Sequence, residues 1–194
     1  MWDSGHRFVV GVDEAGRGPL AGPVVAAAVV FPFMEDPIPG VTDSKQLSHE
    51  ERITLFPVIQ EKSIDIGIGI IDCTVIDQIN ILQATFRAMS TAISMLEVAP
   101  EFILIDGNGA PCCSYPLETI IHGDALCFSI SAASIIAKVV RDEIMVEYDA
   151  IYPGYGFAQH KGYATELHVD CLRKLGLSPI HRRSFRPKEL LDIY

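Results

Sequence analysis

The 194-residue chain lacks the cysteine spacing of a disulfide framework or a zinc site. Its five cysteines are an odd number, and no two of them form a CxxC pair. Secreted disulfide-bonded domains and structural zinc sites depend on paired cysteines, whereas reduced thiols are the rule in the cytosol. We therefore expect free thiols and a cytoplasmic protein.

The sequence also lacks a segment suited to secretion or membrane insertion. Its first ten residues have neither the basic start nor the cleavage region of a secretory signal. The longest apolar stretch, residues 19–33, contains Pro23 and Pro32 and is too short to span a bilayer. Because no association motif is evident either, we expect a soluble monomer that has no membrane partner.

Positive charge is scarce, since the formal net charge is −10. Nucleic-acid-binding proteins are usually basic, so the charge argues against such a partner. Carboxylates that bind a divalent metal are neutralised in the working protein, however, and a basic patch can be local. Hydrophobic residues make up 49% of the chain, which is enough for one domain with a sizeable core and excludes wholesale disorder.

Short apolar segments alternate with longer ones that have helical spacing. Ser48 and Glu51 form a capping box, Thr74 and Asp77 form a weaker one, and Pro57 is expected to kink or divide the first helix. Their order predicts an α/β fold in which a mixed five-stranded sheet is flanked by helices, with a small C-terminal helical extension. The predicted strands are residues 9–12, 24–31, 64–71, 102–105 and 119–121, and the predicted helices are the segment after Ser48 and residues 74–96, 129–148 and 164–175.

Four acidic residues follow predicted strands, where open α/β sheets usually place their sites. They are Asp13, Glu14, Asp106 and Asp124. Carboxylate oxygens suit hard divalent cations, and two such cations can stabilise both the attacking and the leaving oxygen of a phosphoryl transfer. Any one of these acids alone is more simply a turn residue. The four together predict a metal site.

The segment Asp13-Glu14-Ala15-Gly16-Arg17-Gly18-Pro19 resembles the signature of the ribonuclease HII family. The resemblance extends from residue 9 to residue 187, with further motifs in the family's order and approximate spacing. These motifs are residues 43–47 (DSKQL), 105–108 (IDGN), 123–125 (GDA), 131–134 (SAAS), 137–142 (AKVVRD), 160–163 (HKGY) and 181–185 (HRRSF).

The resemblance implies a ribonuclease H-like catalytic domain over residues 1–194, in which about 150–194 form a C-terminal extension that contributes to substrate binding. It implies that the four acids are catalytic carboxylates that bind Mn²⁺ or Mg²⁺. It also implies that Gly16-Arg17-Gly18 and Tyr163 read the ribonucleotide at an RNA–DNA junction. Glycines let backbone amides approach a sugar closely, and the 2′-hydroxyl distinguishes RNA from DNA.

The predicted helix 129–148 has a narrow polar stripe. At 100° per residue, Ser131, Ser134, Lys138 and Asp142 fall within an arc of about 80°. Hydroxyls and a lysine suit the phosphate oxygens of a nucleic acid, whereas the alternative is an ordinary solvent-facing stripe. Periodicity does not decide, but the position after Asp124 favours phosphate contact. Asp142 remains a second candidate for the fourth acid.

Three further features have two interpretations each. Lys45 meets a phosphate or faces water, and Tyr163 stacks on a sugar or base or lies at the edge of the core. His160, His168 and His181 lack the tight spacing of metal ligands and are interpreted as structural or supporting residues.

The sequence predicts an endonuclease that hydrolyses the RNA strand of RNA–DNA hybrids and cuts 5′ of ribonucleotides embedded in DNA, giving 3′-hydroxyl and 5′-phosphate ends by two-metal-ion catalysis. A hybrid-binding module without catalysis is one alternative, against which the four acids argue. A metal-dependent phosphatase of small molecules is another, against which the polar stripe argues. His122 and Leu126 stand where the family often has lysine, so we expect weaker attraction to phosphate.

Overall fold

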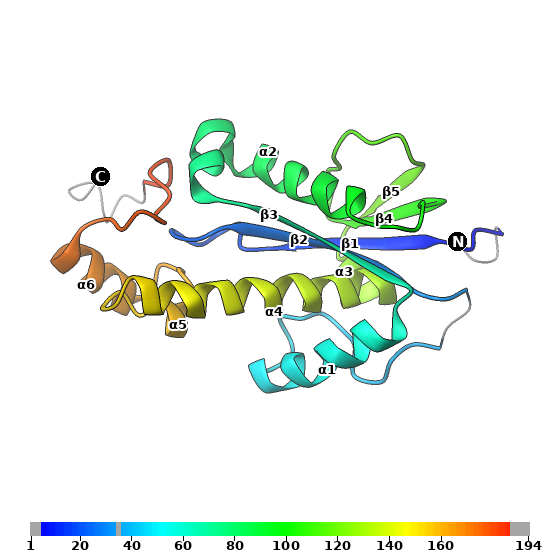
Figure 1. Ribbon diagram of the computed structural model, residues 1–194, viewed down its shortest axis with the longest axis horizontal. Helices are drawn as coiled ribbons and strands as arrows, with labels where there is room; N and C mark the ends of the chain where they lie inside the picture. The colour runs from blue at the N-terminus through cyan, green and yellow to red at the C-terminus, as the bar shows by residue number, and fades with distance from the viewer. Residues whose placement is uncertain (1–4, 34–35, 187–194) are drawn as a thin grey trace.

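The computed structural model describes residues 5–33 and 36–186 (Figure 1). The N-terminal residues 1–4 and the part of the expected C-terminal extension from residue 187 onward lie outside the described residues. The strands are β1 (Val9–Ala15), β2 (Val24–Val30), β3 (Asp65–Ile71), β4 (Phe102–Asp106) and β5 (Leu117–Ile120). The helices are α1 (His49–Lys62), α2 (Cys73–Ser94), α3 (Gly123–Leu126), α4 (Phe128–Ile151), α5 (Phe157–His160) and α6 (Glu166–Leu175).

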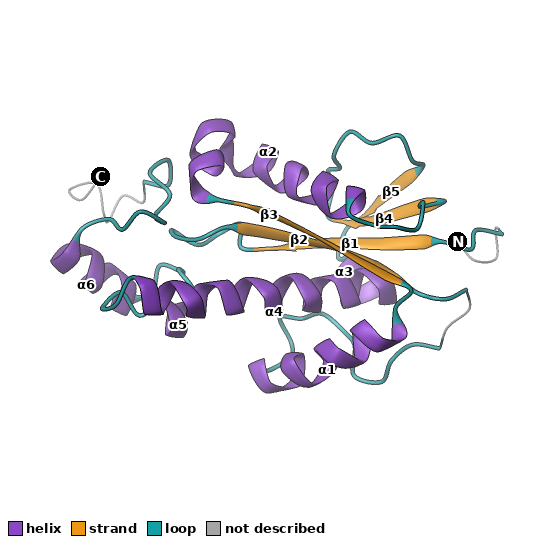
Figure 2. Ribbon diagram, in the orientation of Figure 1, coloured by secondary structure: helices purple, strands orange, loops and turns teal. Residues whose placement is uncertain are grey.

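One sheet of five strands forms the centre of the molecule, in the order β3-β2-β1-β4-β5. Strand β2 is antiparallel to both β1 and β3, whereas β4 is parallel to β1 and β5 is parallel to β4. The sheet is therefore mixed, as predicted. Helix α2 covers one face, α4 covers the other, and α1 lies on the outside of α4 (Figure 2).

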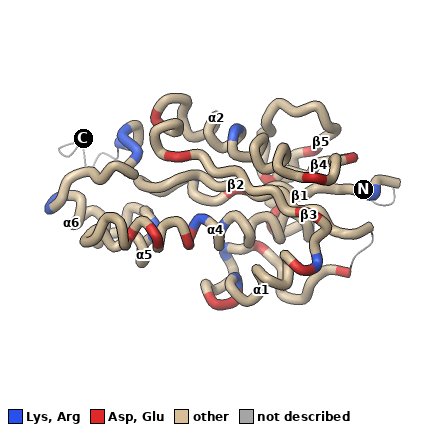
Figure 3. Tube along the Cα trace, in the orientation of Figure 1, with Lys and Arg blue, Asp and Glu red and all other residues tan. Residues whose placement is uncertain are grey.

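Strand β2 separates two cores because its apolar side chains alternate between the two faces of the sheet. Val24 and Ala26 belong to the cluster beneath α2, whereas Val25 and Ala27 belong to the cluster beneath α4. All seven residues of β2 are buried. The charged residues lie mainly along helices and loops, and β2 has none (Figure 3). Among the described residues, no helix is both apolar enough and long enough to cross a bilayer.

Strand β3 is half-buried as expected, but its more deeply buried face is the one that carries the glycines. Gly67 and Gly69 are buried, whereas the isoleucines on the opposite face are partly exposed or exposed. A Cβ atom at Gly67 would lie 1.9 Å from the carbonyl oxygen of Ala92, and one at Gly69 would lie 2.0 Å from that of Ala88. The glycines thus allow the backbone of α2 to lie directly on β3.

The helices agree with the predictions only in part. Helix α1 is capped by Ser48 and Glu51 as expected, and Pro57 lies within it without dividing it. Helix α2 is capped by Asp72 rather than by Thr74, and it is interrupted at Asn80, where φ is 68°. The Asn80 side chain accepts a hydrogen bond from the Gln83 amide at 3.1 Å, so it caps the second half of α2.

Three buried histidines form the centre of the C-terminal region, as the structural interpretation predicted. The Nε2 atoms of His168 and His181 are 2.9 Å apart. His168 Nδ1 donates to the Tyr163 carbonyl oxygen, since a carbonyl only accepts, and His181 Nδ1 accepts from the Ser178 amide. His181 Nε2 therefore donates to His168 Nε2. Burial lowers the pKa of His168 to about 4 and that of His181 to about 3, so both are neutral near pH 7.

This histidine pair predicts a loss of stability in mild acid. Both pKa values are lowered in the folded protein, so below about pH 6.5 the unfolded chain binds more protons and the folded state is disfavoured. Between pH 7 and pH 5 each histidine contributes a loss of about 2 kcal/mol. We expect His168→Gln to reduce the fall in unfolding free energy over this range by about that amount, as measured by urea denaturation.

His49 provides the control because its side chain is exposed, so His49→Gln removes one histidine and leaves the buried ones in place. It should leave the pH dependence close to that of the parent. An equal loss in the parent and in His168→Gln would contradict the assignment of the acid sensitivity to the buried pair.

Candidate active site

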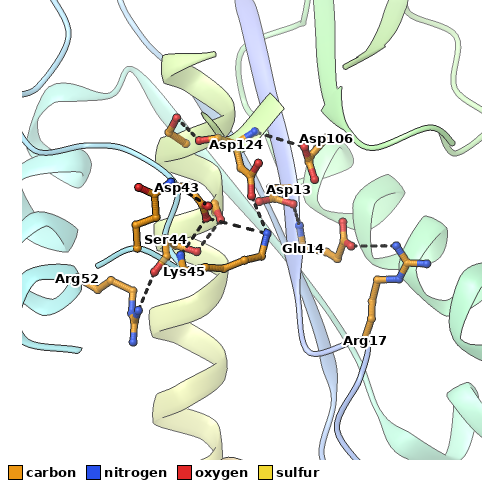
Figure 4. Close-up of polar contacts among 12 residues, drawn as sticks. Asp13, Glu14, Arg17, Asp43, Ser44, Lys45, Arg52, Asp106 and Asp124 are labelled. Atoms are coloured by element: carbon orange, nitrogen blue, oxygen red, sulfur yellow. Dashed lines mark hydrogen bonds and ion pairs between the residues drawn. The ribbon is translucent and has the colours of Figure 1, made fainter. Parts of the chain in front are cut away.

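The predicted acids meet because β1 and β4 are parallel neighbours that end at the same edge of the sheet. Val12 pairs with Ile105, which places Asp13 beside Asp106. Asp124 comes from α3, directly after β5, which pairs with β4. One carboxylate oxygen from each of Asp13, Asp106 and Asp124 lies within 4.8 Å of the others (Figure 4). The structure thus brings three of the four predicted acids into one cluster.

Backbone hydrogen bonds orient these carboxylates. The Glu14 amide donates to Asp13 Oδ1 at 2.7 Å, and the Asp124 amide donates to Asp106 Oδ1 at 3.3 Å. The Ser131 hydroxyl donates to the carbonyl oxygen of Asp124 at 2.7 Å, which ties α3 to α4. Backbone amides therefore orient two of the three carboxylates, and Lys45 bonds the third.

The cluster is electrostatically unfavourable on its own. Asp13 is 4% exposed, and burial, followed by the charges of Glu14 and Asp106, raises its pKa well above the ordinary value. A divalent cation between these oxygens would offset the repulsion, and crowded hard oxygen ligands are the donor set that Mg²⁺ and Mn²⁺ prefer. The residues therefore fit a divalent metal ion.

Glu14 is placed differently from the other three acids. Its Oε1 lies 3.3 Å from Arg17 NH1, so the side chain points toward the exposed arginine (Figure 4). Burial raises the pKa of Glu14, and Arg17 acts in the opposite direction. Glu14 lines the same cleft but is not one of the three clustered acids.

Lys45 contacts the acid cluster. The sequence alone did not decide whether this side chain meets a phosphate or faces water. Its Nζ lies 2.6 Å from Asp124 Oδ2, and this hydrogen bond raises the pKa of Lys45. The loop that carries Lys45 is anchored by Ser44, whose hydroxyl oxygen is 2.7 Å from that of Ser134. Arg52 NH1 also donates to the Ser44 carbonyl oxygen at 2.7 Å. Ser44 lies within one of the motifs named above, but the sequence did not predict that Ser44 and Arg52 support the site.

A cleft of about 230 Å³ joins most of the predicted site residues. Its lining contains Asp13, Glu14, Gly16, Arg17, Gly18, Lys45, Asp106, Ser134, Lys138 and Tyr163, together with Ala15 and Ser44. Asp124 and Ser131 are not in this lining, and the Ser131 hydroxyl is buried and bonded to backbone carbonyls. The polar groups of the cleft therefore come from β1, β4, α4 and three loops.

The polar stripe of α4 faces the protein rather than solvent. Ser131, Ser134 and Asp142 are each 4% exposed, which excludes the solvent-facing alternative for them. Lys138 forms an ion pair with Asp142. Asp142 is bonded within this pair and does not belong to the acid cluster, so the geometry favours Asp124 as the fourth acid.

Gly16 has a positive φ of 94° and lies against the side chain of Arg141. A Cβ atom there would sit 2.0 Å from Arg141 Nε. Substitution of Gly16 would therefore disturb the buried side chain of Arg141. Arg141 and Arg182 both bond this loop, and both were missed as supporting residues although they occur in the quoted motifs.

Comparison with known proteins identifies the architecture. The family model for ribonuclease HII matches residues 10–188. Ribonuclease HII of Geobacter sulfurreducens is 54% identical over 182 residues, which cover 94% of this chain and 83% of that protein.

Two solved structures share the fold. The ribonuclease H2 of Pyrococcus horikoshii OT3 has a TM-score of 0.79 and 27% identity, covering 96% of both chains. Bst-RNase HIII in complex with Mn²⁺ has a TM-score of 0.67 and 21% identity, covering 97% of this chain and 70% of that one. The ribonuclease H-like fold expected from the sequence is thus confirmed.

Charge repulsion at Asp13 generates a prediction about stability. Asp13→Asn keeps the acceptor for the Glu14 amide and removes a buried negative charge. Without divalent metal at pH 7, we expect a gain of roughly 1 kcal/mol, or about 2–4 °C in Tm for a chain of this size. Mn²⁺ should raise the Tm of the parent more than that of the variant.

The control is Asp170→Asn on the exposed surface of α6, where Asp170 pairs with Arg173. Exposed ion pairs contribute little, so its Tm should stay close to that of the parent. A lower metal-free Tm in Asp13→Asn would show that the carboxylates do not repel one another in the folded protein.

Proposed function

Since the chain belongs to the ribonuclease HII family, we propose that it cuts the RNA strand of RNA–DNA hybrids and the bond 5′ of ribonucleotides embedded in DNA. The family is one of metal-dependent ribonuclease H hydrolases, and this chain is such an enzyme. The products of the proposed reaction are a 3′-hydroxyl and a 5′-phosphate. The observation that carries the proposal is the acid cluster at the cleft that Gly16-Arg17-Gly18 also lines.

Asp13, Asp106 and Asp124 are the residues proposed to hold the metal, and Glu14 is proposed to complete the set from the same cleft. Mn²⁺ or Mg²⁺ fits their oxygens, and Bst-RNase HIII, which shares the fold, was crystallised with Mn²⁺. Two bound cations would supply activation of the attacking water and stabilisation of the leaving 3′-oxygen. The protein contributes the geometry, because hydrogen bonds to Asp13 and Asp106 fix their orientation.

The scissile phosphate is proposed to lie beside Lys45, Ser134 and Lys138, which line the cleft with the acids. Lysine ammonium groups and hydroxyls are common donors to phosphate oxygens. The Lys45 side chain is 75% exposed although its ammonium contacts Asp124 and lies 4.0 Å from Asp43, so it can also reach a phosphate at the mouth of the cleft. Lys45 is paired with Asp124 and Lys138 with Asp142, so both ammonium groups would be shared between a carboxylate and the phosphate.

Discrimination of RNA from DNA is proposed to be local to one nucleotide. Gly18 faces Tyr163, because a Cβ atom at Gly18 would lie 3.9 Å from Tyr163 Cε1. Tyr163 is 43% exposed, so its ring is available to a sugar. A 2′-hydroxyl between this ring and the backbone of the Gly16-Arg17-Gly18 turn can donate and accept hydrogen bonds.

We further infer that the segment after residue 150 works with the sheet as part of one domain. The Leu20 amide donates to the Gly162 carbonyl oxygen at 2.8 Å, and the Gly22 amide donates to that of Ile180 at 2.9 Å. These bonds bring Tyr163 to the loop that follows β1. The extension therefore contributes a wall of the proposed substrate site.

Cleavage of a duplex with one embedded ribonucleotide tests the acid cluster. We expect Asp106→Asn and Asp124→Asn each to lower the single-turnover rate with Mn²⁺ at least roughly 100-fold, the scale of losing one electrostatic contact to the reacting phosphate. Asp142→Asn should lower it much less, because Asp142 lies outside the cluster. A larger effect of Asp142→Asn than of Asp124→Asn would reverse the two assignments.

A matched pair of duplexes tests the reading of the sugar. The two differ in one 2′-hydroxyl, and the parent should cut only the ribonucleotide-containing duplex at that position. Tyr163→Ala should lower the cleavage rate by about tenfold or more while changing the Kd for the matched all-DNA duplex by less than threefold, because Tyr163 positions a ribose rather than many phosphates. Equal cleavage of the two duplexes by the parent would remove the junction-reading part of the proposal.

A further inference from the structure

Two arginines are fully buried beneath the loop of residues 16–23. Arg141 and Arg182 are each 0% exposed. Within the described part of the chain, the hydrogen-bond acceptors found for both guanidinium groups are backbone carbonyl oxygens. A buried arginine is usually paired with a carboxylate. The role of these two arginines should therefore follow from the backbone segments that they bond.

The bonds of Arg182 all go to the glycine-rich loop. Its NH2 donates to the Gly16 carbonyl oxygen at 2.6 Å and to that of Pro23 at 3.1 Å. Its NH1 donates to the Arg17 carbonyl oxygen at 3.0 Å, and its Nε donates to that of Gly22 at 3.0 Å. One side chain therefore fixes both ends of the loop.

Arg141 joins the same loop to the segment that presents Tyr163. Its Nε donates to the Pro23 carbonyl oxygen at 3.0 Å, and its NH2 donates to that of Ala21 at 3.1 Å. Its NH1 donates to the Lys161 carbonyl oxygen at 3.1 Å, two residues before Tyr163. The Arg141 Cζ also lies 5.9 Å from the centre of the Tyr163 ring.

We propose that Arg141 and Arg182 are positioning residues for ribonucleotide recognition, which set the distance between the Gly16-Arg17-Gly18 turn and Tyr163. Neither arginine lines the cleft, so each acts through the backbone that it bonds. This inference rests on the proposed function, in which the turn and the tyrosine contact one sugar. It adds that two buried arginines, which do not contact the substrate, fix the separation between the turn and the tyrosine.

The planar guanidinium is what the geometry requires. Arginine offers five N–H donors in a fixed plane, whereas lysine carries the same charge on a single nitrogen. A lysine at position 182 could not reach carbonyl oxygens at Gly16, Arg17 and Gly22 together. Replacement by lysine therefore keeps the net charge and the attraction to nucleic acid, and loses the bonds that hold the loop.

The test compares binding of two duplexes that differ in one 2′-hydroxyl, with Ca²⁺ in place of Mg²⁺ and a gel to confirm that no strand is cut. The readout is the ratio of the two Kd values, which does not change when part of a variant preparation is unfolded. We expect Arg141→Lys and Arg182→Lys to prefer the ribonucleotide-containing duplex about tenfold less than the parent does. Their Mn²⁺ affinity should stay within about twofold, because the acid cluster is bonded separately.

The matched control is Arg183→Lys, the exposed neighbour of Arg182, which should keep the parent ratio. If Arg182→Lys does not fold, by circular dichroism, Arg141→Lys and Arg141→Gln decide the question. A parent preference retained by a folded Arg141 variant would overturn the inference. Absence of any preference in the parent would instead overturn junction reading in the proposed function, so the two failures are distinguishable.

Discussion

The repulsion among carboxylates at the end of β1 and β4 is the constraint that the site depends on. Parallel pairing of the two strands brings Asp13 and Asp106 together, and Asp124 joins them from α3. Like charges at this distance destabilise a folded protein unless something holds them in place. Here the amides of Glu14 and Asp124, the serines of α4 and Lys45 share that work. A stable sheet thus keeps in place an arrangement that favours a divalent cation.

The acid cluster and the loop that is proposed to read the sugar are supported by different parts of the fold. The acids are fixed by the sheet and by α3, whereas the Gly16-Arg17-Gly18 turn depends on Arg182 and on the segment around Gly162. The histidine pair extends this support, since His168 bonds the carbonyl oxygen of Tyr163. The loop and the tyrosine are therefore held by polar bonds as well as by apolar packing, since Leu20 and Ala21 belong to a buried apolar cluster. Such bonds make an interior rigid when every donor has an acceptor.

Sequence reasoning was most reliable where a pattern has a single physical meaning. The alternation and turn residues predicted the strands, and acids after neighbouring parallel strands could be expected at one edge. It failed where long-range contacts decide, because no local signal shows that Arg182 lies under Gly16 or that the Ser131 hydroxyl is bonded to Asp124. The break in α2 at Asn80 shows the same limit, since the sequence did not predict it.

The bond between Arg182 and Gly16 joins residues 166 positions apart. During synthesis on a ribosome, the strand that bears Asp13 is made well before the arginine that completes the loop beside it. At the usual 5–20 residues per second, the delay is roughly 10–30 s. The nascent chain can pair β1 with β2 early, but the loop that is proposed to read the sugar gains its bonds to Arg182 only after this delay. The proposed selectivity thus depends on a contact that forms later in synthesis than the strand that bears Asp13.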